Sequence, residues 1–132
     1  AQLLYVSKKM PFISPTELAE IKQLHTIIPT HSFLMSFSSY DAAWLYGFTQ
    51  TYKIIAPGTL DENKWNYAQW QEFWSTKDIK KRADLLTMYN TKEIYIYVND
   101  TLKGVAQELF SKDPHIQIVN SHIWKYQFSP SL

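Results

Sequence analysis

The residues best placed for chemistry in this sequence lie in one short stretch, Ser38 to Trp44, which follows an apolar run. That run, Ser32 to Phe37, has the length of a buried strand, and Asp41 can cap a helical turn that begins at Ala42. Ligand sites of open α/β sheets lie beyond the carboxyl ends of the strands, so this crossing is where we expect a ligand. The candidate contact residues are its polar and aromatic side chains: Ser38, Ser39, Tyr40, Asp41, Trp44 and Tyr46.

Two serines in this stretch raise the question of catalysis. Ser38 and Ser39 stand at a strand-to-helix elbow, which is where many hydrolases place their nucleophile. The elbow of those enzymes has glycines on both sides of the serine, and none flanks the serines here. The capping role explains Asp41 without catalysis. We therefore predict no catalytic residue in this chain and keep a small serine hydrolase as the least favoured alternative.

Neither the histidines nor the glycines have the spacing of a metal or phosphate site. The histidines are His25, His31, His115 and His122, and the glycines are Gly47, Gly58 and Gly104. No two histidines have the i, i+4 spacing of a helical zinc motif. A dinucleotide- or phosphate-binding loop needs closely spaced glycines, and these are far apart. We therefore expect no metal and no cofactor.

The chain is unusually aromatic, at 16% of residues, with five Trp and nine Tyr. Aromatic faces can stack on sugar rings, but they more often pack in a core. The residues to which both interpretations apply are Trp44, Tyr46, Trp65, Tyr67 and Trp70. Helical spacing places Trp70, Phe73 and Trp74 on one face, which predicts that these three pack inward together.

Composition and charge limit the classes of function. A chain of 132 residues with 45% hydrophobic and 19% charged residues is typical of one globular domain. The net charge of +1 provides no long-range attraction to nucleic acid, so we expect no nucleic-acid partner. The absence of cysteine excludes disulfides and thiol catalysis. No apolar run approaches the roughly 20 residues of a membrane-spanning helix.

Helical and extended patterns alternate along the chain. Helices are predicted after a cap at Ser14, around Trp70, after a cap at Ser75 or Thr76, and around a face formed by Val105, Ala106, Leu109 and Phe110. Strands are predicted over 32–37, 53–56, 93–98, 115–119 and 122–128, the last two as a hairpin. The 93–98 run is apolar on both faces, as in a central strand. This order predicts an α/β fold: a three-layer, mainly parallel Rossmann-like sheet with helices on both faces and an antiparallel C-terminal edge.

Five segments taken together carry a family resemblance. They are Ser39 to Gly47, Lys53 to Gly58, Trp70 to Trp74, Leu85-Leu86 and Tyr95 to Val98. They resemble the soluble extracytoplasmic domain that follows the membrane helices in polytopic glycosyltransferases of the GT-C type. Such domains carry a D-x-x-W-[LV]-Y-G-like turn, a K-x-I-A-P-G strand and a W-x-x-F-W helix. The likeness covers roughly residues 16 to 128 and rests on loose, partly hydrophobic motifs.

The resemblance implies a location and a role. Residues 1–132 would be a single α/β domain excised from a longer membrane protein, on the extracytoplasmic face of the cell membrane. In that family the catalytic acidic residue lies near the first membrane helices, so no catalytic residue is carried over onto this chain. The domain would cover the active site or contact the acceptor. Its partners would be the membrane-embedded part of the same polypeptide and a carbohydrate or lipid-linked sugar acceptor.

A different class of function stays open beside this one. The chain could be a free-standing module, cytoplasmic in location, that binds a sugar or another small ligand through the Ser38 to Trp44 stretch.

Overall fold

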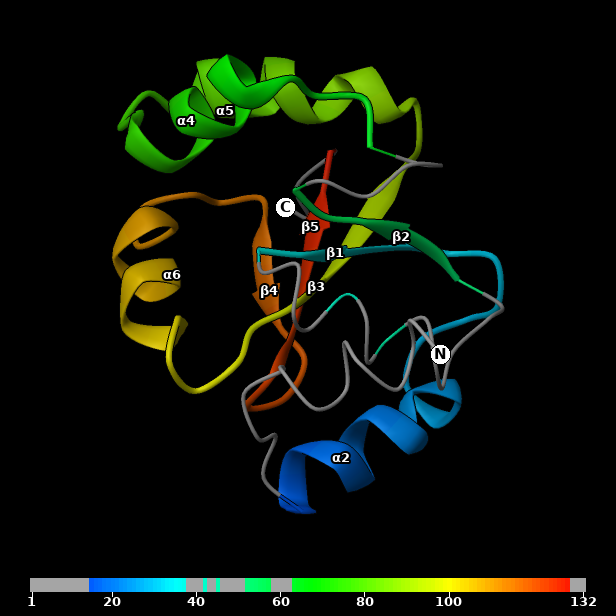
Figure 1. The fold of residues 1–132 in the computed structure, drawn as a ribbon. Coiled ribbons are helices and arrows are strands. Elements are labelled where there is room, and N and C mark those ends of the chain that lie inside the picture. The colour runs from blue at the N-terminus through cyan, green and yellow to red at the C-terminus, as the bar shows by residue number, and fades with distance from the viewer. Residues whose placement is uncertain (1–14, 38–41, 43–44, 46–51, 58–62, 129–132) are drawn as a thin grey trace, which may run out of the picture.

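The computed structural model describes residues 15–37, 42, 45, 52–57 and 63–128, and Figure 1 shows how they are arranged. Five strands form one sheet in the order β2-β1-β3-β5-β4. The strands are β1 (Phe33–Ser36), β2 (Lys53–Ile55), β3 (Glu93–Tyr97), β4 (Ile116–Ile118) and β5 (Ile123–Gln127). The helices are α2 (Pro15–Lys22), α4 (Tyr67–Ser75), α5 (Ile79–Leu86) and α6 (Lys103–Leu109), with 3-10 turns η1 (Leu24–Thr26) and η2 (Thr87–Tyr89). The chain is therefore α/β, as the sequence predicts.

The sheet is mixed. β1 pairs in parallel with β2 on one side and with β3 on the other. β5 is antiparallel to β3, and β4 is antiparallel to β5, which confirms the predicted C-terminal hairpin and antiparallel edge. Parallel pairing is limited to β2, β1 and β3, so the expectation of a mainly parallel sheet holds for the central strands and not for the whole sheet. β3 lies in the middle of the sheet, as its apolar pattern predicts.

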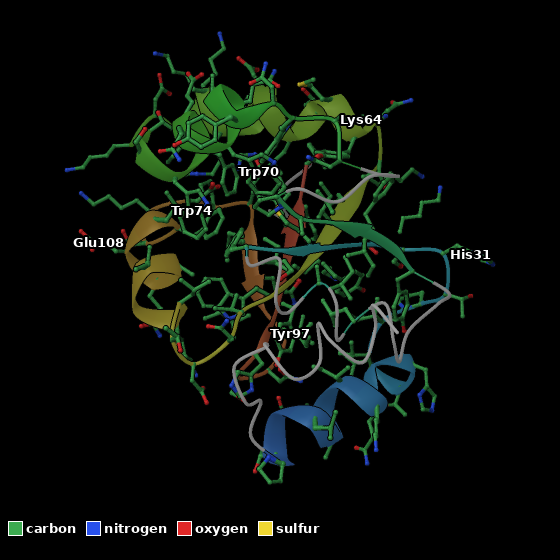
Figure 2. All side chains as sticks on the ribbon, viewed as in Figure 1. His31, Lys64, Trp70, Trp74, Tyr97 and Glu108 are labelled. Carbon is green, nitrogen blue, oxygen red and sulfur yellow. The ribbon has the colours of Figure 1, made fainter. Side chains whose placement is uncertain are left out.

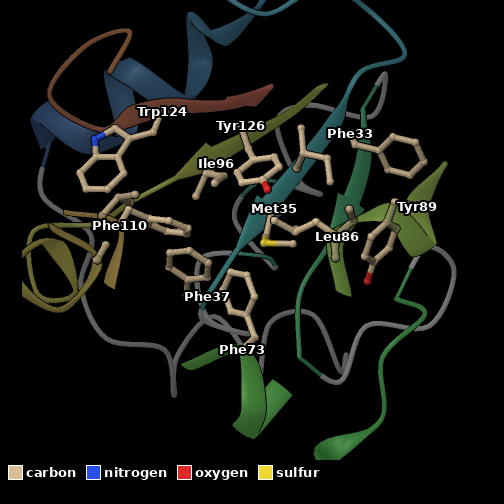
Figure 3. Close-up of a cluster of buried hydrophobic side chains, with 14 of the residues drawn as sticks. Phe33, Met35, Phe37, Phe73, Leu86, Tyr89, Ile96, Phe110, Trp124 and Tyr126 are labelled. Carbon is tan, nitrogen blue, oxygen red and sulfur yellow. The ribbon is translucent and has the colours of Figure 1, made fainter. Parts of the chain in front are cut away.

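Alternation along the strands divides the core between the two faces of the sheet. One cluster joins strand residues such as Met35 and Ile96 to side chains from α4, α5 and the end of α6, with Phe73, Leu86 and Phe110 among them (Figure 3). The second cluster joins the alternate strand positions to the α2 region, and it includes Leu34, Ile54, Tyr95, Ile21 and Leu24. In Figure 1, α2 accordingly lies across the sheet from α4 and α5.

The starts of two helices show how local sequence sets their bounds. Asn66 begins α4 with a capping box: its side chain accepts from the backbone N–H of Gln69 at 2.9 Å, and the Gln69 side chain accepts from the Asn66 N–H at 2.9 Å. Asp78 caps α5, where its carboxylate accepts from two backbone N–H groups. The predicted cap at Ser75 or Thr76 is therefore wrong. Ser75 is still inside α4, and only Asp78 is close enough to the first turn of α5.

The face of α6 differs from its prediction at one residue. Ala106 and Phe110 are buried and Leu109 is half-buried, as expected, but Val105 is 50% exposed. Residues 106 and 110 lie one turn apart and face the sheet, so Val105 points away from it. This exposed side chain lines a cavity that is considered below.

No helix within the described ranges is long and apolar enough to cross a membrane.

Candidate functional site

The predicted contact residues lie outside the described part of the chain. They are Ser38, Ser39, Tyr40, Asp41, Trp44 and Tyr46. Two residues between them are described: Ala42 and Leu45 are both helical and buried in the core cluster on the α2 side of the sheet. Their positions agree with the predicted helical turn after Asp41.

Strand order identifies the end of the sheet at which a ligand is most expected, namely the end formed by the carboxyl ends of β1 and β3. The chain passes from β1 to β2 on one side and later places β3 on the other side of β1. The carboxyl ends of β1 and β3 therefore flank a topological switch point, where ligands of open α/β sheets bind. β5 begins at this same end, because Ile123 lies opposite Tyr97 and the Val98 N–H donates to the carbonyl of His122 at 2.8 Å.

A buried histidine marks this end of the sheet. His122 is 6% exposed, and its ring stacks on Tyr97 with centroids 6.2 Å apart. Its Nε2 is 2.7 Å from a carboxylate oxygen of Asp100, in the turn after β3. Its Nδ1 forms a short hydrogen bond with the carboxylate of Glu20 on α2. His122 thus joins three segments of the chain that are distant in sequence.

The electrostatics of His122 fit a structural role. Burial alone lowers its pKa, but hydrogen bonds and charges from Asp100 and Glu20 raise the pKa overall above its ordinary value. The protonated ring donates from both nitrogens and has no lone pair left to accept a proton. In this arrangement His122 links α2 to the turn after β3 through the carboxylates of Glu20 and Asp100. Within the described ranges, no three His, Cys, Asp or Glu side chains are grouped so that they could hold a metal ion.

A pocket lined by aromatic residues lies beside the end of β2, and we call it the aromatic pocket. Its volume is about 260 Å³, and its walls include Pro57, Trp65, Tyr67, Trp70 and Trp74, together with the amides of Asn63 and Gln71. None of these lining side chains is charged. Pro57 follows β2, and the other lining residues belong to α4 and the segment that leads into it.

Two of the tryptophans form a fixed wall. Trp65 and Trp70 are 3% and 5% exposed, and their rings meet edge to face at 4.7 Å. The Trp65 indole N–H donates to the carbonyl of Leu85 at 3.0 Å, and the Trp70 indole N–H donates to Oδ1 of Asn63 at 3.1 Å. These hydrogen bonds fix the orientation of both rings. The expectation that Trp70 and Phe73 pack inward is confirmed, since Phe73 is fully buried.

The other two aromatic rings are accessible to different extents. Tyr67, in the first turn of α4, is 80% exposed. Trp74 is half-buried, so only part of its predicted core role is seen. Figure 2 shows Trp70 and Trp74 on the side of α4 that faces the rest of the molecule. The ring of Trp74 packs on Phe37 at 4.5 Å, and Phe37 immediately precedes the predicted contact residues.

Sequence reasoning missed the partners in these sites because they are far apart in the chain. Glu20 and His122 are separated by 102 residues, and nothing in the local pattern around either predicts their contact. Part of the aromatic pocket could be identified from the sequence, because Trp65, Tyr67 and Trp70 are among the residues that could either stack on a sugar or pack in the core. Spacing alone does not show which ring is exposed.

Comparison of the chain with protein-family models, with curated protein sequences and with solved structures finds no match. The resemblance to the extracytoplasmic domains of GT-C-type glycosyltransferases therefore remains a prediction from the sequence.

Proposed function

We propose that this chain is a non-catalytic α/β domain that binds carbohydrate in the aromatic pocket. The observation that carries the proposal is that the exposed ring of Tyr67 and the half-buried ring of Trp74 line one pocket, whose described lining holds amides and no charge. Aromatic rings offer apolar faces for the C–H faces of a sugar. The amides of Asn63 and Gln71 supply donors and acceptors of the kind that sugar hydroxyls need.

The size of the pocket supports a small, neutral ligand. Pockets for small molecules usually measure about 300–1,000 Å³, and this one is just below that range. A hexose has about twelve heavy atoms, and at about 0.3 kcal/mol per atom its dissociation constant lies in the millimolar range. Buried Trp65 and Trp70 keep their places without ligand, so no ordering of these side chains opposes binding.

Saturation-transfer NMR with a panel of neutral hexoses and N-acetylhexosamines tests this proposal. Tyr67→Ala removes the exposed ring, and Ile118→Ala is the matched control because Ile118 is also exposed, at 64%, on β4. We expect at least one sugar to give signal with the wild type and with Ile118→Ala, and to lose it with Tyr67→Ala. Equal signals in all three proteins, or no signal from any sugar, would contradict the proposal.

We further propose that residues 1–132 are the extracytoplasmic domain of a membrane glycosyltransferase-like protein. In that protein the domain covers the active site or contacts a carbohydrate or lipid-linked sugar acceptor. The support is the sequence resemblance, together with the location of two of its segments: Pro57 from one and Trp70 and Trp74 from another line the same pocket. The partner is the membrane-embedded part of the same polypeptide.

The gene sequence upstream of Ala1 tests this context. Several encoded membrane spans, with an acidic residue in their first outer loop, would support it. A reading frame that starts at Ala1 would contradict it and leave a free-standing sugar-binding module as the account of the pocket.

We also propose that the sheet and its helices form a three-layer Rossmann-like arrangement. The support is the division of the core into two clusters, one joined to α4, α5 and α6 and the other to the α2 region. A crystal structure of the domain tests it, and a sheet face left uncovered by helix would contradict it.

A further inference from the structure

A second, larger cavity lies between the α4–α5 junction and α6, and we call it the α4–α6 pocket. Its volume is about 570 Å³, which is within the usual range for small-molecule sites. Apolar side chains from both sides line it: Trp74, Ile79, Val105 and Leu109. Figure 2 labels Trp74, which comes from α4, and Glu108, which comes from α6. Val105 is 50% exposed, so the pocket holds apolar surface that the fold itself leaves uncovered.

The charged residues of this pocket are unevenly arranged. Arg82 and Asp113 are both buried, and they pair with each other at 3.2 Å. Lys77 and Lys112, on opposite sides of the pocket, are exposed, and Glu108 is the exposed anion among the lining residues. With the buried pair neutral, two exposed cations face one exposed anion. The lining therefore has an excess of positive charge.

The hydrogen-bond partners of Arg82 do not use all of its donors. Nη1 donates to Asp113 and Nη2 donates to the carbonyl of Thr76 at 2.9 Å. Nε is buried and has no acceptor among the described residues. The second carboxylate oxygen of Asp113 is occupied elsewhere, by the backbone N–H of His115 at 3.0 Å and by its ring at 2.8 Å. Asp113 thus accepts from both Arg82 and His115, and the Arg82 Nε–H is left as a buried donor without an acceptor among the described residues.

We propose that the α4–α6 pocket binds a small organic anion, a molecule with an apolar ring and one carboxylate or phosphate group. The ring packs on Trp74 and Val105, and the anionic group lies toward Lys77 and Lys112. The hydroxyl of Ser111 is also in the lining and can donate to such a group. This inference does not depend on sugar binding. Trp74 lines both pockets, but the charged residues on which the anion depends line the α4–α6 pocket and not the aromatic pocket.

Amide-resolved NMR titration with three probes tests the proposal: phenyl phosphate, benzoate and neutral benzyl alcohol. We expect at least one of the two anions to shift the amides of residues 74–79 and 105–113 and to bind at least fivefold more tightly than benzyl alcohol. The two anions distinguish a phosphate from a carboxylate ligand. Inorganic phosphate alone should bind at least about tenfold more weakly than the tighter of the two anions, because it leaves the apolar walls unfilled.

Single charge changes sharpen the test without disturbing the fold, because every residue chosen is exposed. Lys77→Ala and Lys112→Ala should each weaken anion binding about two- to fivefold, and Glu108→Gln should strengthen it by a similar factor. Lys92→Ala makes the same charge change away from the pocket and should leave affinity unchanged. Equal affinity for benzyl alcohol, an equal effect of Lys92→Ala, or no shifts at residues 74–79 and 105–113 with any probe would overturn the proposal.

Discussion

Replacing Asp113 with Asn removes the carboxylate that pairs with Arg82 inside the protein. The side chains of Arg82 and Asp113 are 2% and 0% exposed, and their closest atoms are 3.2 Å apart. The pair joins α5 to the segment before β4, and it lies against Phe110, whose ring centre is 5.1 Å from the guanidinium carbon. Asparagine keeps the shape of the side chain, removes its charge and replaces one of its two acceptor oxygens with an NH2 donor.

The expected cost of Asp113→Asn follows from the burial of its partner. Without Asp113, Arg82 is a buried charge that has lost its carboxylate partner. Breaking a buried ion pair by removing one partner typically costs about 3–5 kcal/mol. A domain is stable by only about 5–15 kcal/mol, so the loss is about a fifth or more of the free energy of unfolding.

Urea unfolding at neutral pH, followed by tryptophan fluorescence, measures this cost. Asp84→Asn is the control, because Asp84 is an exposed carboxylate on α5, and its change should stay within about 0.5 kcal/mol. In a double-mutant cycle, Arg82→Met combined with Asp113→Asn should cost clearly less than the sum of the two single changes. A cost below about 1 kcal/mol for Asp113→Asn, or simple additivity in the cycle, would refute the reasoning.

Four other substitutions separate structural from surface roles. Trp70→Ala should lower the free energy of unfolding in urea by about 3–5 kcal/mol because Trp70 is 5% exposed. Tyr67→Ala should lower it little because Tyr67 is 80% exposed. Similar losses for the two variants would contradict the assignment of Trp70 to the core and Tyr67 to the surface. Asn66→Ala removes the cap of α4 and should cost about 0.5–2 kcal/mol, and an unchanged urea midpoint would argue against the capping box. The pKa of His122 is raised above its ordinary value of 6.5 in the fold, so its contribution to stability is fully present below pH 6.5 and is lost as pH rises through the folded pKa. His122→Gln should remove this part of the pH dependence, and identical profiles for both proteins across that range would show that the ring does not titrate in this way.

Much of the fold follows from local pattern. The run from Glu93 to Val98 has apolar or aromatic residues at successive positions, so both faces of an extended chain are apolar. This pattern predicts a strand covered on both sides, and β3 is that strand. The turn after β3 also depends on a nearby residue, because the Asn99 side chain accepts from the backbone N–H of Leu102 at 2.7 Å. Neither inference needs knowledge of a distant residue.

The sites depend on distant contacts, which pattern does not give. Arg82 ends a basic run that begins at Lys77, so the sequence indicates an exposed cation, yet its partner Asp113 lies 31 residues away and both are buried. Asp113 with Pro114 predicts only the end of a helix. The same limit applies to His122, whose carboxylate partners come from other elements. Such long-range ion pairs depend on how distant elements pack together, and local residue spacing does not predict them.

The central claim, carbohydrate binding in the aromatic pocket, is tested most directly by the tryptophan indole N–H resonances. Trp74 lines the pocket, while Trp124 is 2% exposed on β5 and lies outside its lining, so it serves as an internal control. Titration with the sugar that gives the strongest saturation transfer should shift the Trp74 indole resonance and the side-chain amide of Gln71, and leave Trp124 unchanged. A sugar that binds without moving Trp74 or Gln71 would contradict the account.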